Sequence, residues 1–326
     1  MDILSDILHI AGLRRRLLDL HALTPGTALR FPCDRSFGLH AVTRGHAFVH
    51  APNLDEPLKL QAGDLVLMAR GCVHQLSLDR TTPTHSTTMT VAPFAGAGLA
   101  DGAPSSRAGA DDTQAVAQII SAAYQFWHAP LHPFLRSLPP WFVVRGHSLP
   151  PLSALPLTIG LLDRELGDEG LGASSATLGL LDALFAFALR EIAQRQNPAV
   201  PGLHHAIADR PIRQVLTLMH GNLGHSWTLE ELGQQAGLSR SALAERFRSA
   251  MGDTPLNHLR TLRMQKAMQL LADTRQSLEQ IAQAVGYQDA FGFSKVFKRT
   301  TGQSPRQFRE QDTADRQSPY RAKEAS

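Results

Sequence analysis

The chain has 326 residues, two cysteines and a formal net charge of +3, and 43% of its residues are hydrophobic. Two cysteines are too few for a disulfide framework, and no stretch of uncharged apolar residues is long enough to span a membrane. The acidic start, which runs into three arginines, is the reverse of a secretory signal peptide. These features predict a cytoplasmic protein of two domains with reduced cysteines and no membrane segment.

Residues 1–20 are predicted to form a short amphipathic helix. Ile3, Ile7, Ile10 and Leu17 recur there at helical spacing and would share one side of the helix.

The period changes between residues 24 and 93, where short apolar runs alternate with turn residues such as Gly45. Short strands with regular turn signals predict a β-barrel or jelly roll. The segment Gly63-Asp64-Leu65-Val66-Leu67-Met68-Ala69-Arg70-Gly71-Cys72-Val73-His74 resembles the second motif of the cupin barrel, with Ala69 in place of the usual proline. We therefore expect a cupin-like barrel in this region.

The resemblance to cupins raises the alternative of a metal-dependent enzyme that carries a second domain. Metal-dependent cupins supply a His-x-His pair and a Glu from their first motif, and residues 31–40 contain neither. Only His74 matches a ligand position of the second motif, and a site of two histidines and a carboxylate needs three converging ligands. We therefore predict no metal, no cofactor and no catalytic residues. A barrel that binds a small effector is the favoured interpretation, and the candidate effector-binding residues are His40, His50, Cys72 and His74.

The Gly-, Ala- and Ser-rich residues 95–113 predict a mobile loop. Residues 114–196 are predicted to be helical, apart from a proline-rich stretch over residues 130–156. The candidate helices are marked by Val116, Ile119 and Ile120, by residues 158–166, and by the apolar stripe of residues 174–196.

Prolines and a histidine pair over residues 197–208 predict a linker between two domains. The first domain then spans residues 1–196 and the second residues 209–311, and the polar residues 312–326 predict a disordered tail.

The second domain is predicted to contain two copies of one helical unit. Leu229, Glu230 and Gly237 recur 49 residues later, and Gly252 and Pro255 recur 50 residues later. A fixed offset that is kept across several residue types indicates an internal repeat.

Each copy of the repeat predicts a helix-turn-helix. Thr228 and Ser277 are each followed three residues later by Glu or Gln, which fits a capping box at a helix start. Gly237 and Gly286 permit the left-handed backbone of a tight turn between the two helices. We expect the second helix of each copy to begin at Ser239 or at Asp289.

Charge separates the two domains. Residues 209–311 carry 14 Lys and Arg against 9 Asp and Glu, a net charge of +5. Residues 1–208 carry 15 against 17, a net charge of −2. The basic character therefore belongs to the repeat, and basic second helices of a helix-turn-helix suit phosphate oxygens and the base edges of the major groove.

The runs Ile281-Ala282-Gln283-Ala284-Val285-Gly286-Tyr287, Phe293-Ser294-Lys295-Val296-Phe297-Lys298 and Gly302-Gln303-Ser304-Pro305-Arg306-Gln307-Phe308-Arg309 resemble the C-terminal domain of AraC/XylS-type transcriptional regulators. The resemblance covers about residues 209–311. It implies two helix-turn-helix units joined by a long helix over about residues 255–272, with residues 239–250 and 289–300 as recognition helices. These helices would enter successive major grooves about one turn (~34 Å) apart.

Expected DNA contacts follow from the outer faces of these two helices. Phosphate contacts are expected from Arg240, Arg248, Lys298 and Arg299. Groove contacts are expected from Ser241, Ala244, Glu245, Ala290, Phe291, Gly292 and Lys295.

The resemblance implies further partners. Double-stranded promoter DNA and RNA polymerase are the expected macromolecular partners of an activator, and helices that follow the barrel would form a homodimer interface. The sequence does not identify the effector, and an organic small molecule, an oxidant and no ligand at all are the alternatives. Some cupin-type regulators of this family sense oxidants through cysteines, which makes Cys33 and Cys72 candidate redox residues, and His74 is a neighbour able to lower the thiol pKa of Cys72. The expected fold is α+β in two domains: a cupin-like β-barrel with a helical appendage, then an all-α domain.

Overall fold

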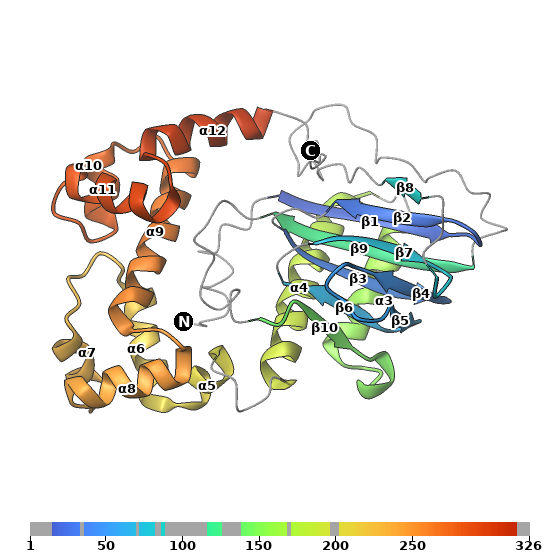
Figure 1. Cartoon of the computed structure of the whole chain (residues 1–326), viewed down its shortest axis with the longest axis horizontal. Helices are drawn as coiled ribbons and strands as arrows, with labels where there is room; N and C mark the ends of the chain where they lie inside the picture. The colour runs from blue at the N-terminus through green and yellow to red at the C-terminus, as the bar shows by residue number, and fades with distance from the viewer. Residues whose placement is uncertain are drawn as a thin grey trace. The chain divides into compact units, whose positions relative to one another are not determined.

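The computed structural model describes residues 15–32, 36–69, 72–81, 86–88, 116–125, 138–167, 171–195 and 202–317. The predicted loop over residues 95–113, Cys33 and most of the predicted N-terminal helix lie outside these residues. The chain divides into two compact units. The first holds the β-strands with helices α3 and α4, and the second holds helices α5 to α12 (Figure 1).

Two five-stranded sheets build the first unit within the described residues. The strands of the first sheet, in spatial order, are β1 (Arg15–Leu23), β9 (Ala117–Gln125), β3 (Ser36–Arg44), β6 (Leu65–Met68) and β10 (Trp141–Val144). Those of the second are β5 (Leu58–Gln61), β4 (His46–His50), β7 (Val73–Ser77), β2 (Ala28–Pro32) and β8 (Ser86–Thr88). Neighbouring strands pair antiparallel, except that β2 and β8 pair parallel.

Apolar side chains of both sheets meet in one core. Val42 and Val66 of the first sheet pack in the same cluster as Val49, Leu60 and Leu76 of the second. Strand residues that point the other way alternate with them, as a pleated strand requires. The predicted barrel or jelly roll of residues 24–93 is thus confirmed as two sheets packed face to face.

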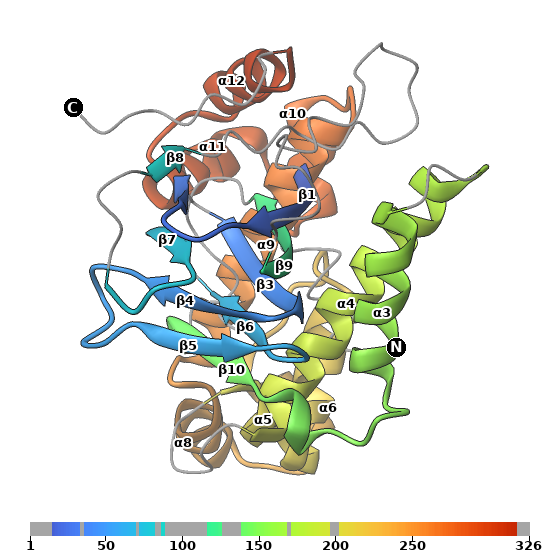
Figure 2. The ribbon, with the colours of Figure 1, turned by 90° about the vertical axis from the view of Figure 1, so that its right-hand side faces the viewer.

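Helices α3 (Ala154–Gly167) and α4 (Ala173–Arg195) belong to the same unit and run beside the first sheet (Figure 2). Helix α3 contacts β3 and β1. The ring of Phe185 on α4 lies 5.3 Å from the ring of Phe37 on β3, centroid to centroid. Both helices were predicted, the first over residues 158–166 and the second from the apolar stripe of residues 174–196. A short 3-10 helix, η1 (Gly146–Ser148), follows β10 inside the predicted proline-rich stretch.

The helix predicted around Val116, Ile119 and Ile120 is wrong, because residues 117–125 form strand β9. This strand lies between β1 and β3, and Ile119 and Ile120 are both buried although they point to opposite faces. A strand covered on both faces shows no alternation of apolar and polar residues, so its sequence lacks the period of a strand. Strand β1 likewise replaces the end of the helix predicted for residues 1–20.

The second unit is all-helical in the described residues. Its helices are α5 (Leu203–Ala208), α6 (Arg210–Gly221), α7 (Leu229–Gln235), α8 (Arg240–Met251), α9 (Pro255–Asp273), α10 (Leu278–Ala284), α11 (Ala290–Thr301) and α12 (Pro305–Gln317). Helix α9 is the predicted long connecting helix. Two departures from the expected boundaries occur: α5 forms within the predicted linker and packs on α6 and α8, and α12 continues into the predicted tail.

The caps of the two copies match closely. Ser239 and Asp289 accept hydrogen bonds from the main-chain N–H groups of Ala242 and Gly292, as predicted for the starts of α8 and α11. Both helices end on a glycine in the left-handed conformation, Gly252 after α8 and Gly302 after α11.

The capping boxes differ between the copies. Ser277 and Gln280 form the complete reciprocal pair at α10. At α7, Thr228 accepts the hydrogen bond from the N–H of Glu231, but the Glu231 carboxylate lies 2.8 Å from Nε2 of His225 instead of returning to the cap. Only half of the predicted box is therefore present there.

Candidate nucleic-acid interface and sensor interior

Helix α8 presents a mixed polar face. Leu243 and Phe247 are fully buried against the domain. The predicted contact residues of this helix lie on its accessible side: Arg240, Ser241, Glu245 and Arg248 are exposed, and Ala244 is half-buried.

Helix α11 presents a face with basic side chains and no acidic one. Phe293 and Phe297 are fully buried, whereas the side chain of Phe291, in the first turn, is 83% exposed. Its exposed cations are Lys295, Lys298 and Arg299, and Ala290 and Gly292 are half-buried near its start. An exposed aromatic ring next to cations, on the outer side of a capped helix, suits a groove that offers both phosphates and apolar thymine methyl groups.

One basic residue of α8 is bound to its own domain. Nε of Arg246 lies 2.5 Å from Oδ2 of Asp209, whose other carboxylate oxygen accepts a hydrogen bond from the N–H of Ile212 at the start of α6. Asp209 is therefore both the cap of α6 and the anchor of α8. This ion pair leaves Arg240 and Arg248 as the predicted phosphate-binding cations of α8.

Two predicted effector residues meet inside the first unit. Nε2 of His40, on β3, lies 2.7 Å from Nε2 of His74, on β7. The two strands belong to different sheets, so this hydrogen bond crosses the interior between them. Phe31 stacks on His74 at 5.2 Å, and Trp141 meets it edge-on at 5.7 Å.

The hydrogen-bond partners fix the protonation of both rings. The carbonyl oxygen of Cys72 can only accept, so Nδ1 of His74 donates to it over 2.8 Å. Burial lowers the pKa of His74 to about 4, so this ring is neutral and its Nε2 accepts the hydrogen bond from Nε2 of His40. Burial also lowers the pKa of His40, whose Nδ1 then accepts from the hydroxyl of Ser121 over 2.7 Å.

The other two candidate effector residues do not join this pair as ligands. His50 alternates with Val49, whose side chain is in the core, so His50 lies on the opposite face of β4. Its Nε2 lies 2.8 Å from Oγ of Ser77. Burial raises the pKa of the Cys72 thiol to about 11. The predicted lowering by His74 does not occur, because a neutral imidazole does not stabilise a thiolate. Cys33 lies outside the described residues.

A cupin metal centre does not fit the described residues. No group of three His, Cys, Asp or Glu side chains in this part of the chain is arranged to hold a metal ion. His40 and His74 use their facing nitrogens to bond each other, and their remaining nitrogens are occupied by Ser121 and Cys72.

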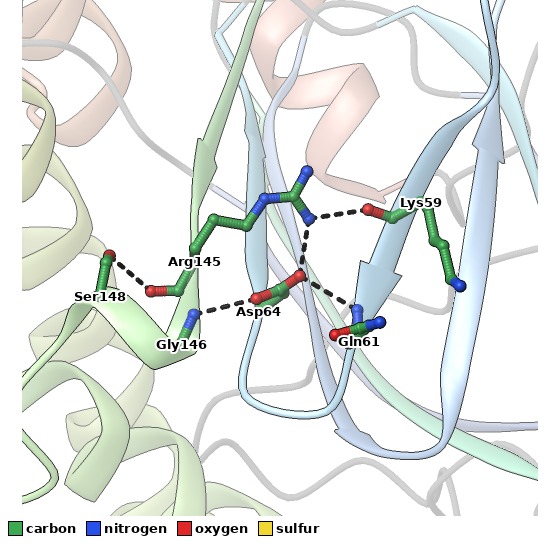
Figure 3. A network of polar contacts seen from close by, with 6 residues as sticks. All are labelled: Lys59, Gln61, Asp64, Arg145, Gly146 and Ser148. Carbon is green, nitrogen blue, oxygen red and sulfur yellow. Dashed lines mark hydrogen bonds and ion pairs between the residues drawn. The ribbon is translucent and has the colours of Figure 1, made fainter.

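A buried carboxylate that sequence reasoning missed connects the turn before β6 to the segment that directly follows β10. Asp64 accepts hydrogen bonds from Nη1 of Arg145 at 2.7 Å and from the N–H of Gly146 at 2.9 Å, as Figure 3 shows. Arg145 also donates to the carbonyl of Lys59. Asp64 and Lys59 are 81 and 86 residues distant from Arg145 in sequence, so no local sequence pattern indicates this network.

No helix in the described ranges has the length and apolarity needed to cross a membrane.

Comparisons with known proteins agree with both units. A family model described as Cupin matches residues 2–194, more than half of the chain, and one described as Helix-turn-helix domain matches residues 232–311. A putative AraC-like transcription regulator of Streptomyces lividans is 29% identical over 316 residues, which cover 96% of this chain and 99% of the relative.

Two further proteins are similar to this chain. The RCS-specific HTH-type transcriptional activator RclR of Escherichia coli K12 is 28% identical over 276 residues, 83% of each chain. The crystal structure of the DNA-binding domain of AdpA in complex with a target DNA is 30% identical, covers 34% of this chain and 99% of that chain, and has a TM-score of 0.32. The chain belongs to the cupin family through its N-terminal region, and its helical region makes it an AraC-type DNA-binding transcriptional regulator.

Proposed function

We propose that this regulator reads a specific promoter sequence by placing α8 and α11 in successive major grooves on one face of the DNA. The observation that carries the proposal is the matched construction of the two helices: each begins at a side-chain cap, buries an apolar row that includes a phenylalanine, and turns basic residues outward. Arg240, Arg248, Lys298 and Arg299 contact phosphates and fix the register.

Sequence discrimination comes mainly from α11 in this proposal. Lys295 donates to guanine, and the exposed ring of Phe291 contacts a thymine methyl group. Ala290 and Gly292 are small and allow the close approach of that turn. On α8, Ser241 and Ala244 face the groove and Glu245 accepts from the amino group of cytosine.

The remaining assignments belong to the same proposal. Residues 1–196 form the sensor and dimerisation domain, residues 197–208 connect it to the DNA-binding domain of residues 209–311, and the tail follows from residue 312. The protein acts in the cytoplasm as a homodimeric activator that recruits RNA polymerase, and it catalyses no reaction. A small effector or an oxidant acts on the sensor domain, and it changes transcription only if it binds two states of the regulator with different affinity.

A selection experiment tests the proposed DNA recognition. The full-length chain is mixed with randomised DNA duplexes, bound duplexes are amplified through several rounds, and the enriched sequences are footprinted. We expect enrichment of a site with two protected segments about one helical turn apart. Binding that never exceeds binding to random duplexes contradicts sequence-specific recognition and favours a general DNA-binding role.

Thermal unfolding tests the sensor. The full-length chain is heated with a panel of metabolites and mild oxidants, and free thiols and total metal are assayed in the same samples. A ligand of the folded state raises the melting temperature in a saturable way, and we expect the shift to disappear in His40→Phe if the effector engages the His40–His74 pair. Loss of two thiols without any ligand shift assigns sensing to Cys33 and Cys72, and stoichiometric metal supports the alternative of a metal-dependent enzyme.

A further inference from the structure

Arg263, in the middle of the connecting helix α9, holds the segment that leads into the first helix-turn-helix. Its Nε donates to the carbonyl oxygen of Leu223 over 2.9 Å, and its Nη2 donates to that of His225 over 2.6 Å. Both acceptors lie between α6 and α7. Hydrogen bonds from a charged donor are stronger than those between neutral groups, so this guanidinium fixes the path of the chain before α7.

The same guanidinium lies against the turn of the second helix-turn-helix. Gly286 adopts a φ of +79°, and a Cβ added there would lie 2.5 Å from Nη2 of Arg263. The Arg263 Cζ is 5.9 Å from the centre of the Tyr287 ring, the next residue of that turn. One side chain therefore contacts structural elements of both repeat units.

Two glycines bring the units together around this side chain. A Cβ on Gly224 would lie 3.3 Å from the carbonyl oxygen of Ala284, and a Cβ on Gly286 would lie 3.0 Å from the carbonyl oxygen of Gly224. The segment before α7 thus packs directly on the turn between α10 and α11. Helix α9 links the two units along the chain, and this contact provides a second link between them.

Arg309 offers an internal comparison. From α12, its Nε donates to the carbonyl of Leu271 over 3.0 Å and its Nη2 to that of Gln276 over 2.8 Å. Arg309 therefore holds the segment before α10 in the way that Arg263 holds the segment before α7. The carbonyls that Arg309 holds lie near the end of α9 and just before α10, next to the second copy, whereas Arg263 also meets the turn of the other copy.

We propose that Arg263 is a positioning residue that fixes the recognition helices α8 and α11 relative to each other, and thereby sets the spacing of the two DNA segments that the regulator accepts. One added base pair moves the second segment by about 3.4 Å and rotates it by about 34° around the DNA axis. A rigid pair of helices cannot follow that displacement without losing contacts. This inference rests on the proposed two-groove binding.

The test measures affinity as a function of spacing. The probe is the duplex that the wild-type chain enriches, together with versions that carry one base pair more or one fewer between the two protected segments. Each duplex is titrated with the full-length wild type, Arg263→Met, Arg263→Lys and Arg309→Met. Circular dichroism and thermal unfolding establish that each variant is folded.

We expect the wild type to prefer the selected spacing. Arg263→Met should reduce that preference by about tenfold, because it removes the charge-assisted hydrogen bonds that hold the two recognition helices in one relative position. Arg263→Lys retains a charge and one donor and restores part of the preference. Arg309→Met loses two bonds of the same kind and keeps the wild-type preference.

Two results overturn the proposal. The first is an unchanged spacing preference in Arg263→Met, whatever happens to its affinity for the selected duplex. The second is an equal loss of preference in Arg309→Met, which makes the effect one of general stability. If the wild type enriches no site with two protected segments, the proposed two-groove binding itself fails, and the role of Arg263 in spacing fails with it.

Discussion

His40 and His74 show how two single residues can join the two sheets through one buried hydrogen bond. Each neutral ring donates one hydrogen bond and accepts one. The two rings therefore form a continuous line of hydrogen bonds from the Ser121 hydroxyl to the Cys72 carbonyl. Buried polar groups that are fully paired stabilise one arrangement of their surroundings. An effector that engages these rings has to replace one of the hydrogen bonds they already make.

The burial of His74 makes stability depend on pH. Its pKa is about 4 in the folded chain, against an ordinary value of 6.5, so between these values the unfolded chain binds the proton and the folded chain does not. Its contribution is therefore complete above about pH 6.5 and is lost as the pH falls towards 4, by at most about 1.4 kcal/mol per pH unit. Urea unfolding between about pH 7 and pH 5 should show a smaller slope in His74→Gln than in wild type. The exposed His147→Gln is the control, and equal slopes in all three proteins contradict the prediction.

Lys295 is the residue of α11 for which base reading can be separated from simple charge attraction. We expect Lys295→Ala to weaken binding to the selected duplex by roughly 1–3 kcal/mol and to change binding to random duplexes much less, because a guanine contact exists only at the specific site. Lys298→Ala removes the same charge from a predicted phosphate contact and should weaken both complexes alike. Titrations of each variant with both duplexes decide the matter, and an equal loss for Lys295→Ala refutes base reading there.

The turns of the two helix-turn-helix units differ in the atoms that surround their glycines. Gly237 and Gly286 both have a positive φ, of 68° and 79°, but a Cβ on Gly237 meets nothing within 4 Å. Alanine in this conformation costs about 1–2 kcal/mol at either position. At Gly286 the added methyl group also displaces Arg263, so Gly286→Ala should lower the free energy of unfolding more than Gly237→Ala does. Urea unfolding of the two variants measures the difference, and equal losses would mean that the contact with Arg263 adjusts freely.

The elements that sequence could predict are those whose signals are local. Caps, turn glycines and a helical period, all within some 20 residues, indicate each helix-turn-helix unit. The same period predicts which residues lie on its surface. Strand β9 has an alanine-rich sequence and is buried on both faces, so neither propensity nor alternation marks it as a strand. The His40–His74 pair and the Asp64–Arg145 pair each join residues more than 30 positions apart, which no spacing rule reveals.

For the whole molecule, charge is divided between the two parts of the sequence. Residues 209–311 carry a net charge of +5 and residues 1–208 a net charge of −2. A protein attracted to DNA only through its total charge responds alike to the loss of any cation. A protein that binds through localised phosphate contacts responds only to the loss of the cations that make them, since each contact releases its own counterions.

Salt dependence separates these two cases. We expect the slope of log affinity against log salt, between about 50 and 200 mM, to become shallower by about 1 in Arg299→Ala, because one phosphate contact is lost. Arg80→Ala removes the same charge from the sheet unit, where Arg80 forms an exposed ion pair with Glu56 at 2.7 Å, and it should leave the slope unchanged. Equal slopes for the two variants would mean that total charge rather than the α11 surface governs the attraction. A shallower slope in Arg299→Ala alone places a phosphate contact on the second recognition helix.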